Sequence, residues 1–175
     1  MYESKYGVLS MIHPFDILIL DNGAQLIFTP CPGTKGVSII DSLKSLKEAG
    51  ARAVITMMTM VELTEKQADT LPSLCAELRM DWYHFPVEDS CAPGEPFAQA
   101  FAQQKAILLG LVESGATIVI HCHGGSGRTG MMAAILMLEL GYAPVQVKTQ
   151  IQLIRPKSLT SPVQVNYLVK KYAYE

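Results

Sequence analysis

The sequence lacks several features that define whole classes of protein. It has only four cysteines, too few for a disulfide-stapled secreted domain, and no Cys-x-x-Cys pair that would indicate a zinc or redox site. The longest uninterrupted apolar run, residues 131–138, is far shorter than the roughly 18 residues that a membrane-spanning helix needs. The first residues also lack the basic and apolar regions of a secretory signal. We therefore expect a cytoplasmic protein with no membrane partner.

Charge is scarce and nearly balanced. Lys and Arg number 14 against 16 Asp and Glu, whereas hydrophobic residues make up 49% of the 175 residues. The longest basic run is the pair Lys170 and Lys171, so we expect no nucleic-acid partner held through its phosphate backbone. The hydrophobic content supports a folded core and excludes an intrinsically disordered chain. The length predicts a single domain over residues 1–175, and the oligomeric state stays open.

Strand and helix signals alternate along the chain. A hairpin is expected over about residues 16–29, because two β-rich runs flank the turn-forming pair Asn22 and Gly23. Further strands are expected at residues 52–56, 82–86 and 117–121. Helices are expected between Ile39 and Gly50, from about Gln67 to Arg79, between Pro96 and Gly115, from about Arg128 to Leu140, near Pro144 and from Pro162. This order predicts an α/β fold with a central, mostly parallel sheet flanked by helices.

One segment, residues 121–130, combines features that fit a single task. Its sequence is His-Cys-His-Gly-Gly-Ser-Gly-Arg-Thr-Gly, and it lies between an apolar, β-branched strand and a helix. Gly124, Gly125 and Gly127 let the backbone turn successive N–H groups inward. The start of the helix adds its positive dipole end at the same point. The segment therefore predicts a nest that binds a phosphate-like oxyanion.

Two side chains add a candidate nucleophile and a positive charge to this nest. The donors that hold a phosphate would also stabilise a thiolate at Cys122, which would make this cysteine a nucleophile. The planar guanidinium of Arg128 can hold two phosphoryl oxygens and neutralise transition-state charge. An inert buried cysteine would need none of the neighbouring glycines. A zinc site at residues 121–123 is disfavoured, because adjacent strand residues point to opposite faces, and we expect neither a metal nor a cofactor.

The pattern His-Cys-x5-Arg-Thr over residues 121–129 resembles the signature of cysteine-dependent phosphatases of the protein tyrosine and dual-specificity type. Residues 32–35, 62–63, 84–89 and 164–168 resemble the cyclin-dependent-kinase-associated branch of that family. The resemblance implies a dual-specificity phosphatase-like fold with its phosphate-binding loop at residues 122–128. It also implies metal-independent hydrolysis of phosphotyrosine, and of phosphoserine and phosphothreonine, in a protein or peptide partner through a phosphocysteine intermediate.

The resemblance assigns roles to particular residues. Cys122 is the expected nucleophile, Arg128 holds the phosphoryl group, and Thr129 assists departure of the sulfur from the intermediate. Asp89 matches the aspartate of the family's acid loop and would protonate the leaving group; the alternative is a solvated loop carboxylate, and Glu88 is a less favoured donor. The expected substrate-binding residues are His123, Gly124, Gly125, Ser126, Gly127 and Gln164.

Three further side chains each have two interpretations. Gln164 resembles a residue that orients the hydrolytic water in related enzymes, but it could equally face solvent on a helix. Glu62 could pair with Arg128, although a helix-surface carboxylate is the favoured interpretation. Cys91 lies in the expected acid loop and could form a reversible disulfide with Cys122, although an ordinary loop thiol is favoured.

Two alternative functions stay open. A catalytically weak phospho-binding module would keep the nest and Arg128, but this chain retains a nucleophile and an acid as well. A phosphatase acting on a non-protein phosphate, such as an RNA 5′-triphosphate, would use the same nest, but the absence of a basic charge balance argues against it. No lysine lies inside the loop, so polyphosphorylated headgroups would meet little positive charge and are disfavoured.

Overall fold

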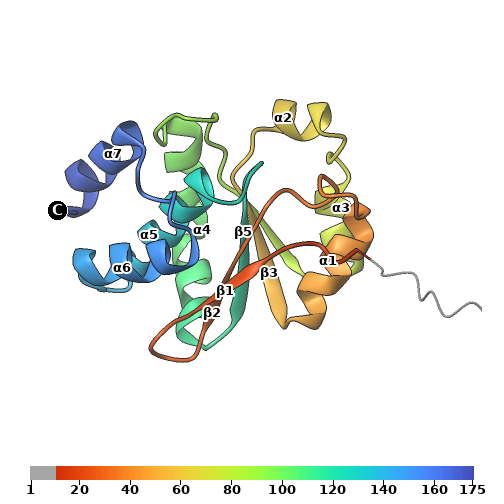
Figure 1. Ribbon diagram of the computed structural model, residues 1–175, viewed down its shortest axis with the longest axis horizontal. Helices are drawn as coiled ribbons and strands as arrows, with labels where there is room; N and C mark the ends of the chain where they lie inside the picture. The colour runs from red at the N-terminus through yellow and green to blue at the C-terminus, as the bar shows by residue number, and fades with distance from the viewer. Residues whose placement is uncertain (1–10) are drawn as a thin grey trace, which may run out of the picture.

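Five strands form one sheet in the order β1-β2-β5-β3-β4 in the computed structural model, which describes residues 11–175 (Figure 1). The pair β1 and β2 is antiparallel, and all other neighbours are parallel. The strands are β1 (Asp16–Ile19), β2 (Gln25–Thr29), β3 (Ala51–Thr56), β4 (Asp81–His84) and β5 (Thr117–His121). The predicted α/β fold with a mostly parallel sheet and an N-terminal hairpin is confirmed. The single domain over residues 1–175 stays a prediction, and residues 1–10 lie outside the described residues.

The helices connect the strands and cover both faces of the sheet (Figure 1). They are α1 (Ile39–Glu48), α2 (Met60–Glu65), α3 (Leu71–Glu77), α4 (Glu95–Glu113), α5 (Gly127–Glu139), α6 (Pro144–Ile154) and α7 (Pro162–Tyr172). No helix within residues 11–175 has both the length and the apolar character needed to span a bilayer.

One predicted helix, from Gln67 to Arg79, is wrong at its start. Gln67 has a φ of +56°, and α3 begins only at Leu71, which places Pro72 in the first turn where its missing N–H is harmless. The separate helix α2 precedes it and was not predicted. A capping box starts α2, in which Thr59 and Glu62 each accept a hydrogen bond from the other's backbone N–H.

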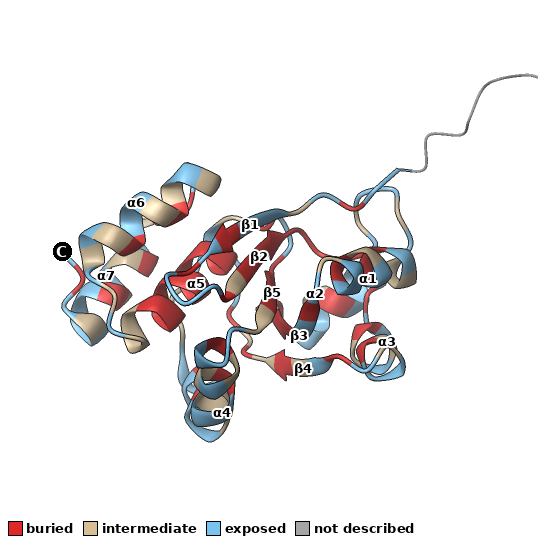
Figure 2. Ribbon diagram, turned by 90° about the horizontal axis from the view of Figure 1, so that it is seen from below, coloured by how far each residue is buried: buried red, intermediate tan, exposed pale blue. Residues whose placement is uncertain are grey.

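The sheet is buried on both faces because alternate residues of its inner strands point to opposite sides. Ile118 and Ile120 of β5 belong to the cluster that includes α4 to α7, whereas Val119 belongs to the cluster formed with α1 and α3. Buried segments accordingly line the centre of the molecule in Figure 2. Strand β5 lies between β2 and β3, so its C-terminal end is among the best-fixed points of the fold.

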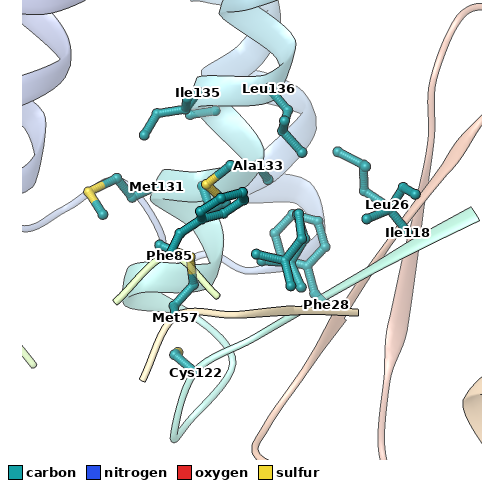
Figure 3. Packing of buried hydrophobic residues seen from close by; sticks show 14 of the residues in the cluster. Leu26, Phe28, Met57, Phe85, Ile118, Cys122, Met131, Ala133, Ile135 and Leu136 are labelled. Atoms are coloured by element: carbon teal, nitrogen blue, oxygen red, sulfur yellow. The ribbon is translucent and has the colours of Figure 1, made fainter. Parts of the chain in front are cut away.

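Helix α5 is buried almost all round. Residues 128–137 are all buried, and α5 packs against β2, β5, α6 and α7. Figure 3 shows Leu136 of α5 on the side of the helix that faces Leu26 and Phe28 of the sheet, Met131 on the opposite side, and Cys122 at the edge of the same cluster. The N-terminus of α5 is therefore held rigidly at the point where the chain leaves β5.

Candidate active site

The loop over residues 122–128, called the phosphate loop below, is anchored by its carbonyl groups. At its start, the Met57 N–H donates to the His121 carbonyl and the Cys31 N–H donates to the His123 carbonyl, each at 3.0 Å. These bonds continue the pattern of neighbouring parallel strands past the end of β5. Because the carbonyls point away from the loop centre, the intervening N–H groups turn toward it.

A second set of anchors comes from the segment after α6. Arg155 donates through Nε to the Gly125 carbonyl (3.1 Å) and through Nη2 to the Phe28 carbonyl (3.2 Å), and the Ser158 hydroxyl donates to the Ser126 carbonyl (2.7 Å). Arg155 also pairs with a carboxylate on β1. Sequence reasoning missed Arg155 and Ser158, because nothing near residue 155 signals a contact with a loop 30 positions earlier.

Gly125 is a position where only glycine fits. Its φ of +81° is a left-handed conformation, and an added Cβ would lie 2.6 Å from the carbonyl carbon of Thr29 and 2.7 Å from the nitrogen of Pro30. The turn of the phosphate loop thus packs directly against the backbone that follows β2. Gly124 differs, because a Cβ there would meet no atom within 4 Å.

The thiol of Cys122 lies at the centre of this loop. Its side chain is buried, and Sγ accepts hydrogen bonds from the Gly125 N–H and from the Thr129 hydroxyl, both at 3.2 Å. The first turn of α5, which carries Thr129, thus points a hydroxyl and its positive dipole end at the sulfur. Such an environment stabilises negative charge on the sulfur or on a ligand beside it.

Arg128 is held by a two-pronged ion pair. Nη1 and Nη2 donate to the two carboxylate oxygens of Glu62 at 2.8 and 3.0 Å, and Nη1 also donates to the Val87 carbonyl at 2.8 Å. Burial raises the pKa of Glu62, but the hydrogen bonds and charge of Arg128 and the bonds from Thr59 outweigh it and leave the pKa below its ordinary value. Of the two interpretations of Glu62, the pairing with Arg128 is therefore correct.

One donor of Arg128 stays without a partner. The side chain is only 2% exposed, and its Nε has no hydrogen-bond acceptor among residues 11–175. A buried charged donor without an acceptor is costly, and such groups are found where a ligand supplies the acceptor. Because Arg128 lines the same cleft as Cys122, an oxyanion bound beside the sulfur would satisfy this donor.

The cleft above the phosphate loop has a volume of about 440 Å³. Its lining comprises Asp89, Ser90, Cys122, His123, Gly124, Ser126, Gly127, Arg128, Lys157, Thr160, Ser161 and Gln164. Oδ1 of Asp89 lies 3.5 Å from Nη2 of Arg128, and the Asp89 side chain is 76% exposed. Glu88 instead lines a separate pocket with His84 and Pro86. The geometry therefore favours Asp89 over Glu88 as the carboxyl group facing Cys122.

Gln164 lies inside this cleft and not on the solvent-facing side of α7. Its side chain is only 3% exposed, and Nε2 donates to the Cys91 carbonyl at 3.5 Å. The solvent-facing interpretation is therefore wrong, because the first turn of α7 points toward the acid loop. Sequence reasoning missed Lys157, Thr160 and Ser161, which line the cleft beside Gln164.

Neither a disulfide nor a cluster of metal ligands occurs within residues 11–175. All four cysteines are free thiols, with Cys91 exposed and Cys122 buried. Cys91 is thus a free loop thiol, which is the favoured interpretation, and a reversible disulfide with Cys122 stays the untested alternative. Across residues 11–175, no three His, Cys, Asp or Glu side chains gather in a way that could hold a metal ion.

A hydrogen-bonded relay orients the strand end that precedes Cys122. The Trp82 Nε1–H donates to the Thr56 hydroxyl (2.8 Å), whose own proton then reaches Nε2 of His121 (2.7 Å). This leaves Nδ1 of His121 as the donor to the Cys122 carbonyl at 3.2 Å. Complete burial lowers the pKa of His121 to about 4, so the ring is neutral near pH 7 and keeps this tautomer.

Comparison with known proteins places the chain among phosphatases. Residues 32–141 match the model of the Tc-R-P family, described as a polymorphic toxin system DSP-PTPase phosphatase. The chain is 27% identical over 128 residues to cyclin-dependent kinase inhibitor 3 of Sus scrofa, and 26% identical over 128 residues to that of Homo sapiens. Each match covers 71% of this chain, and the chain spans only 59% of the length of each relative.

Solved structures agree with the fold. The chain resembles kinase associated phosphatase with its catalytic-site cysteine replaced by serine, with a TM-score of 0.80, 22% identity, and coverage of 95% of this chain and 99% of that chain. It also resembles Tk-PTP in its active form, with a TM-score of 0.62, 20% identity, and coverage of 86% and 92%. The predicted dual-specificity phosphatase-like fold is confirmed.

Replacing Gly125 with alanine tests the tight turn of the phosphate loop. We expect the free energy of unfolding to fall by at least about 1–2 kcal/mol, because alanine disfavours this φ and its Cβ would strike the backbone of Thr29. Binding of inorganic phosphate, measured by calorimetry, should weaken as the loop opens. The matched Gly124→Ala change meets open space and should alter stability by less than about 0.5 kcal/mol. Equal losses in the two variants would contradict this account.

The buried, neutral His121 predicts a loss of stability in mild acid. Between its ordinary value of 6.5 and its folded pKa of about 4, the unfolded chain binds a proton that the folded protein excludes, so stability falls as pH drops through this window. The slope should approach about 1.4 kcal/mol per pH unit at its steepest. Urea denaturation at several pH values should show a shallower slope for His121→Gln than for wild type. Parallel slopes would show that His121 does not carry the effect.

Proposed function

Because the chain belongs to the Tc-R-P family of DSP-PTPase phosphatases, we propose that it is a metal-independent protein phosphatase that acts through a phosphocysteine intermediate. One observation carries this proposal. The sulfur of Cys122 receives hydrogen bonds from Gly125 and Thr129 at the floor of a cleft that also holds Arg128 and Asp89. A nucleophile, a charged oxyanion donor and an acid thus meet around one point.

In the first step, the Cys122 thiolate attacks phosphorus and the bond from phosphorus to the substrate oxygen breaks. The phosphate-loop N–H groups and the unpartnered Nε of Arg128 hold the equatorial oxygens, where negative charge is greatest in the transition state. Asp89 donates its proton to the departing oxygen, which leaves as an alcohol or phenol. The product of this step is a phosphoryl group on Cys122 and a dephosphorylated protein.

In the second step, water attacks the phosphocysteine. Asp89, now ionised, takes the proton of the water, and the amide of Gln164, which lines the same cleft, orients that water. The sulfur leaves as a thiolate stabilised by the Thr129 hydroxyl, to which it is already hydrogen-bonded. Inorganic phosphate departs and the enzyme returns to its starting state.

We further propose a phosphorylated protein or peptide as substrate. The curated relatives and the similar solved structure are named for kinases, which are protein partners. Besides the phosphate loop, the cleft is lined only by Asp89 and Ser90 of the acid loop and by four residues between Lys157 and Gln164. We expect so short a lining to accept phosphotyrosine and the shorter phosphoserine and phosphothreonine side chains. A mechanism that needs a free thiolate also suits a reducing compartment, which supports a cytoplasmic location.

Hydrolysis of p-nitrophenyl phosphate with a chelator present tests the nucleophile. Cys122→Ser should lower the rate by about 1000-fold or more, because serine is a far weaker nucleophile, yet it should still bind phosphopeptides. Cys91→Ser removes an exposed thiol of the same chain and should leave the rate within about two-fold of wild type. A wild type that binds phosphopeptides without turning them over would instead indicate a binding module, and a rate abolished by the chelator would contradict a metal-independent mechanism.

The acid is tested by a pair of variants that remove the same charge from neighbouring positions. Asp89→Asn should lower kcat on phosphotyrosine and phosphothreonine peptides by about 10²–10⁴-fold, because the leaving oxygen then departs without a proton. Glu88→Gln should have little effect, because Glu88 lines a different pocket. The loss in Asp89→Asn should be smaller on p-nitrophenyl phosphate, whose leaving group needs less protonation. Equal losses of kcat in Asp89→Asn and Glu88→Gln would show that Asp89 is not the general acid. Wild-type activity on phosphotyrosine peptides alone would contradict dual specificity.

A further inference from the structure

One part of the cleft, called the C-terminal wall below, is built from residues 157–164. It comprises the loop between α6 and α7 and the first turn of α7, and its cleft-lining residues are Lys157, Thr160, Ser161 and Gln164. These side chains offer an ammonium group, two hydroxyls and an amide, but no carboxylate. The wall therefore adds a second positive charge to the cleft, beside that of Arg128 in the phosphate loop, which contains no lysine.

The ammonium group of Lys157 has no partner among the described residues. Among the described residues, no carboxylate lies within ion-pair distance of its ammonium group, and its Nζ makes no hydrogen bond to the protein. In the nearby Arg155, by contrast, each of the three guanidinium nitrogens has a partner, because it donates to the carbonyls of Gly125 and Phe28 and pairs with Asp16. Lys157 thus presents a free positive charge at the edge of the cleft.

The start of α7 adds to this positive character. Ser161 is the N-cap of α7, but its side chain makes no capping hydrogen bond, and Pro162 follows at the first helical position. The first-turn N–H groups of this 11-residue helix, those of Val163 and Gln164, therefore receive no cap from the Ser161 side chain, and the positive dipole end lies in the wall. The Thr160 hydroxyl donates to the Lys157 carbonyl at 2.7 Å and ties the two parts of the wall together.

An independent observation places a ligand in this cleft. The unpartnered Nε of Arg128, in a side chain that is 2% exposed, indicates that one oxyanion binds beside Cys122. With that oxyanion on Arg128, a second negative group on the same ligand would be attracted by Lys157, whereas Asp89 and Ser90 on the acid loop offer it no positive charge. The cleft is therefore more positive at the C-terminal wall than at the acid loop.

We propose that the C-terminal wall selects substrates that carry a second anionic group beside the phosphorylated residue, with Lys157 as the specificity-determining residue. The inference rests on the proposed phosphatase function. The preferred substrate is a phosphopeptide with an acidic side chain or a second phosphate next to the residue that is hydrolysed. A cleft of about 440 Å³ has room for both the reacting phosphate and such a neighbour.

The expected effect is modest, because Lys157 lies near solvent where an ion pair contributes about 1 kcal/mol or less. We expect wild type to hydrolyse a Glu-flanked phosphopeptide with a kcat/KM about 5-fold above that of the same peptide flanked by Gln. This preference should shrink as salt is raised toward 0.5 M, because exposed charges are screened. A peptide with a second phosphate in the flanking position should be preferred at least as strongly as the Glu-flanked peptide.

The decisive comparison uses Lys157→Gln and Lys148→Gln, which lower the net charge equally. Lys148 is exposed on α6 and does not line the cleft, so its variant should keep the preference. Lys157→Gln should bring the ratio of the two kcat/KM values close to one, and Lys157→Glu should reverse it. Lys148→Gln should also hydrolyse p-nitrophenyl phosphate at the wild-type rate, because Lys148 lies outside the cleft. For Lys157→Gln and Lys157→Glu, the measured quantity is the ratio of kcat/KM between the two peptides.

The outcomes separate the two proposals. A wild type without activity on p-nitrophenyl phosphate would overturn the phosphatase function itself. Normal activity on that substrate, combined with equal use of the Glu- and Gln-flanked peptides, would overturn only the role of the C-terminal wall. An equal loss of preference in Lys148→Gln would also overturn it, because net charge would then be the cause. A 5′-triphosphorylated oligonucleotide hydrolysed with a higher kcat/KM than every peptide would overturn the assignment of a protein substrate.

Discussion

The site depends on one constraint: the carbonyl groups around the phosphate loop must point away from Cys122 so that its N–H groups can point toward it. Partners distant in sequence enforce this orientation. Met57 and Cys31 extend the sheet past the end of β5, and Arg155 and Ser158 hold the turn at Gly125 and Ser126. Since these carbonyls have their partners outside the loop, the inward N–H groups are available for an anion without reorganisation when it binds.

The ion pair between the buried Arg128 and the partly exposed Glu62 connects this loop to the acid loop. Glu62 is placed by the capping box of α2, and its two oxygens fix the guanidinium plane. The same guanidinium holds the Val87 carbonyl, two residues before Asp89, so the position of the acid depends on the group that would bind the phosphate. Removing one partner of such a pair leaves a buried charge without compensation, which is strongly destabilising.

The architecture supplies the rigidity that this chemistry needs. Strand β5 lies inside a sheet buried on both faces, and α5 is enclosed by the sheet and by α6 and α7. The phosphate loop joins these two elements, which is the usual position of anion sites at the carboxyl ends of parallel strands. Asp89 and Lys157 are more exposed and come from loops beside the phosphate loop. Such loops can contact substrates of different shapes.

Local sequence patterns were enough to predict the features that depend on neighbouring residues. The strand and helix order, the hairpin, the glycine-rich turn and the roles expected of Cys122 and Arg128 all follow from local patterns, because β-branched runs, glycines and a signature of nine residues act within a few positions. Local pattern failed where tertiary packing overrides it, as at the start of α3. Only the tertiary structure decided that Glu62 pairs with Arg128, that Gln164 faces the cleft, and that Arg155 and Lys157 approach a loop about 30 residues earlier. These contacts depend on how helices dock on the sheet, and long-range docking leaves no periodic signal in a single chain.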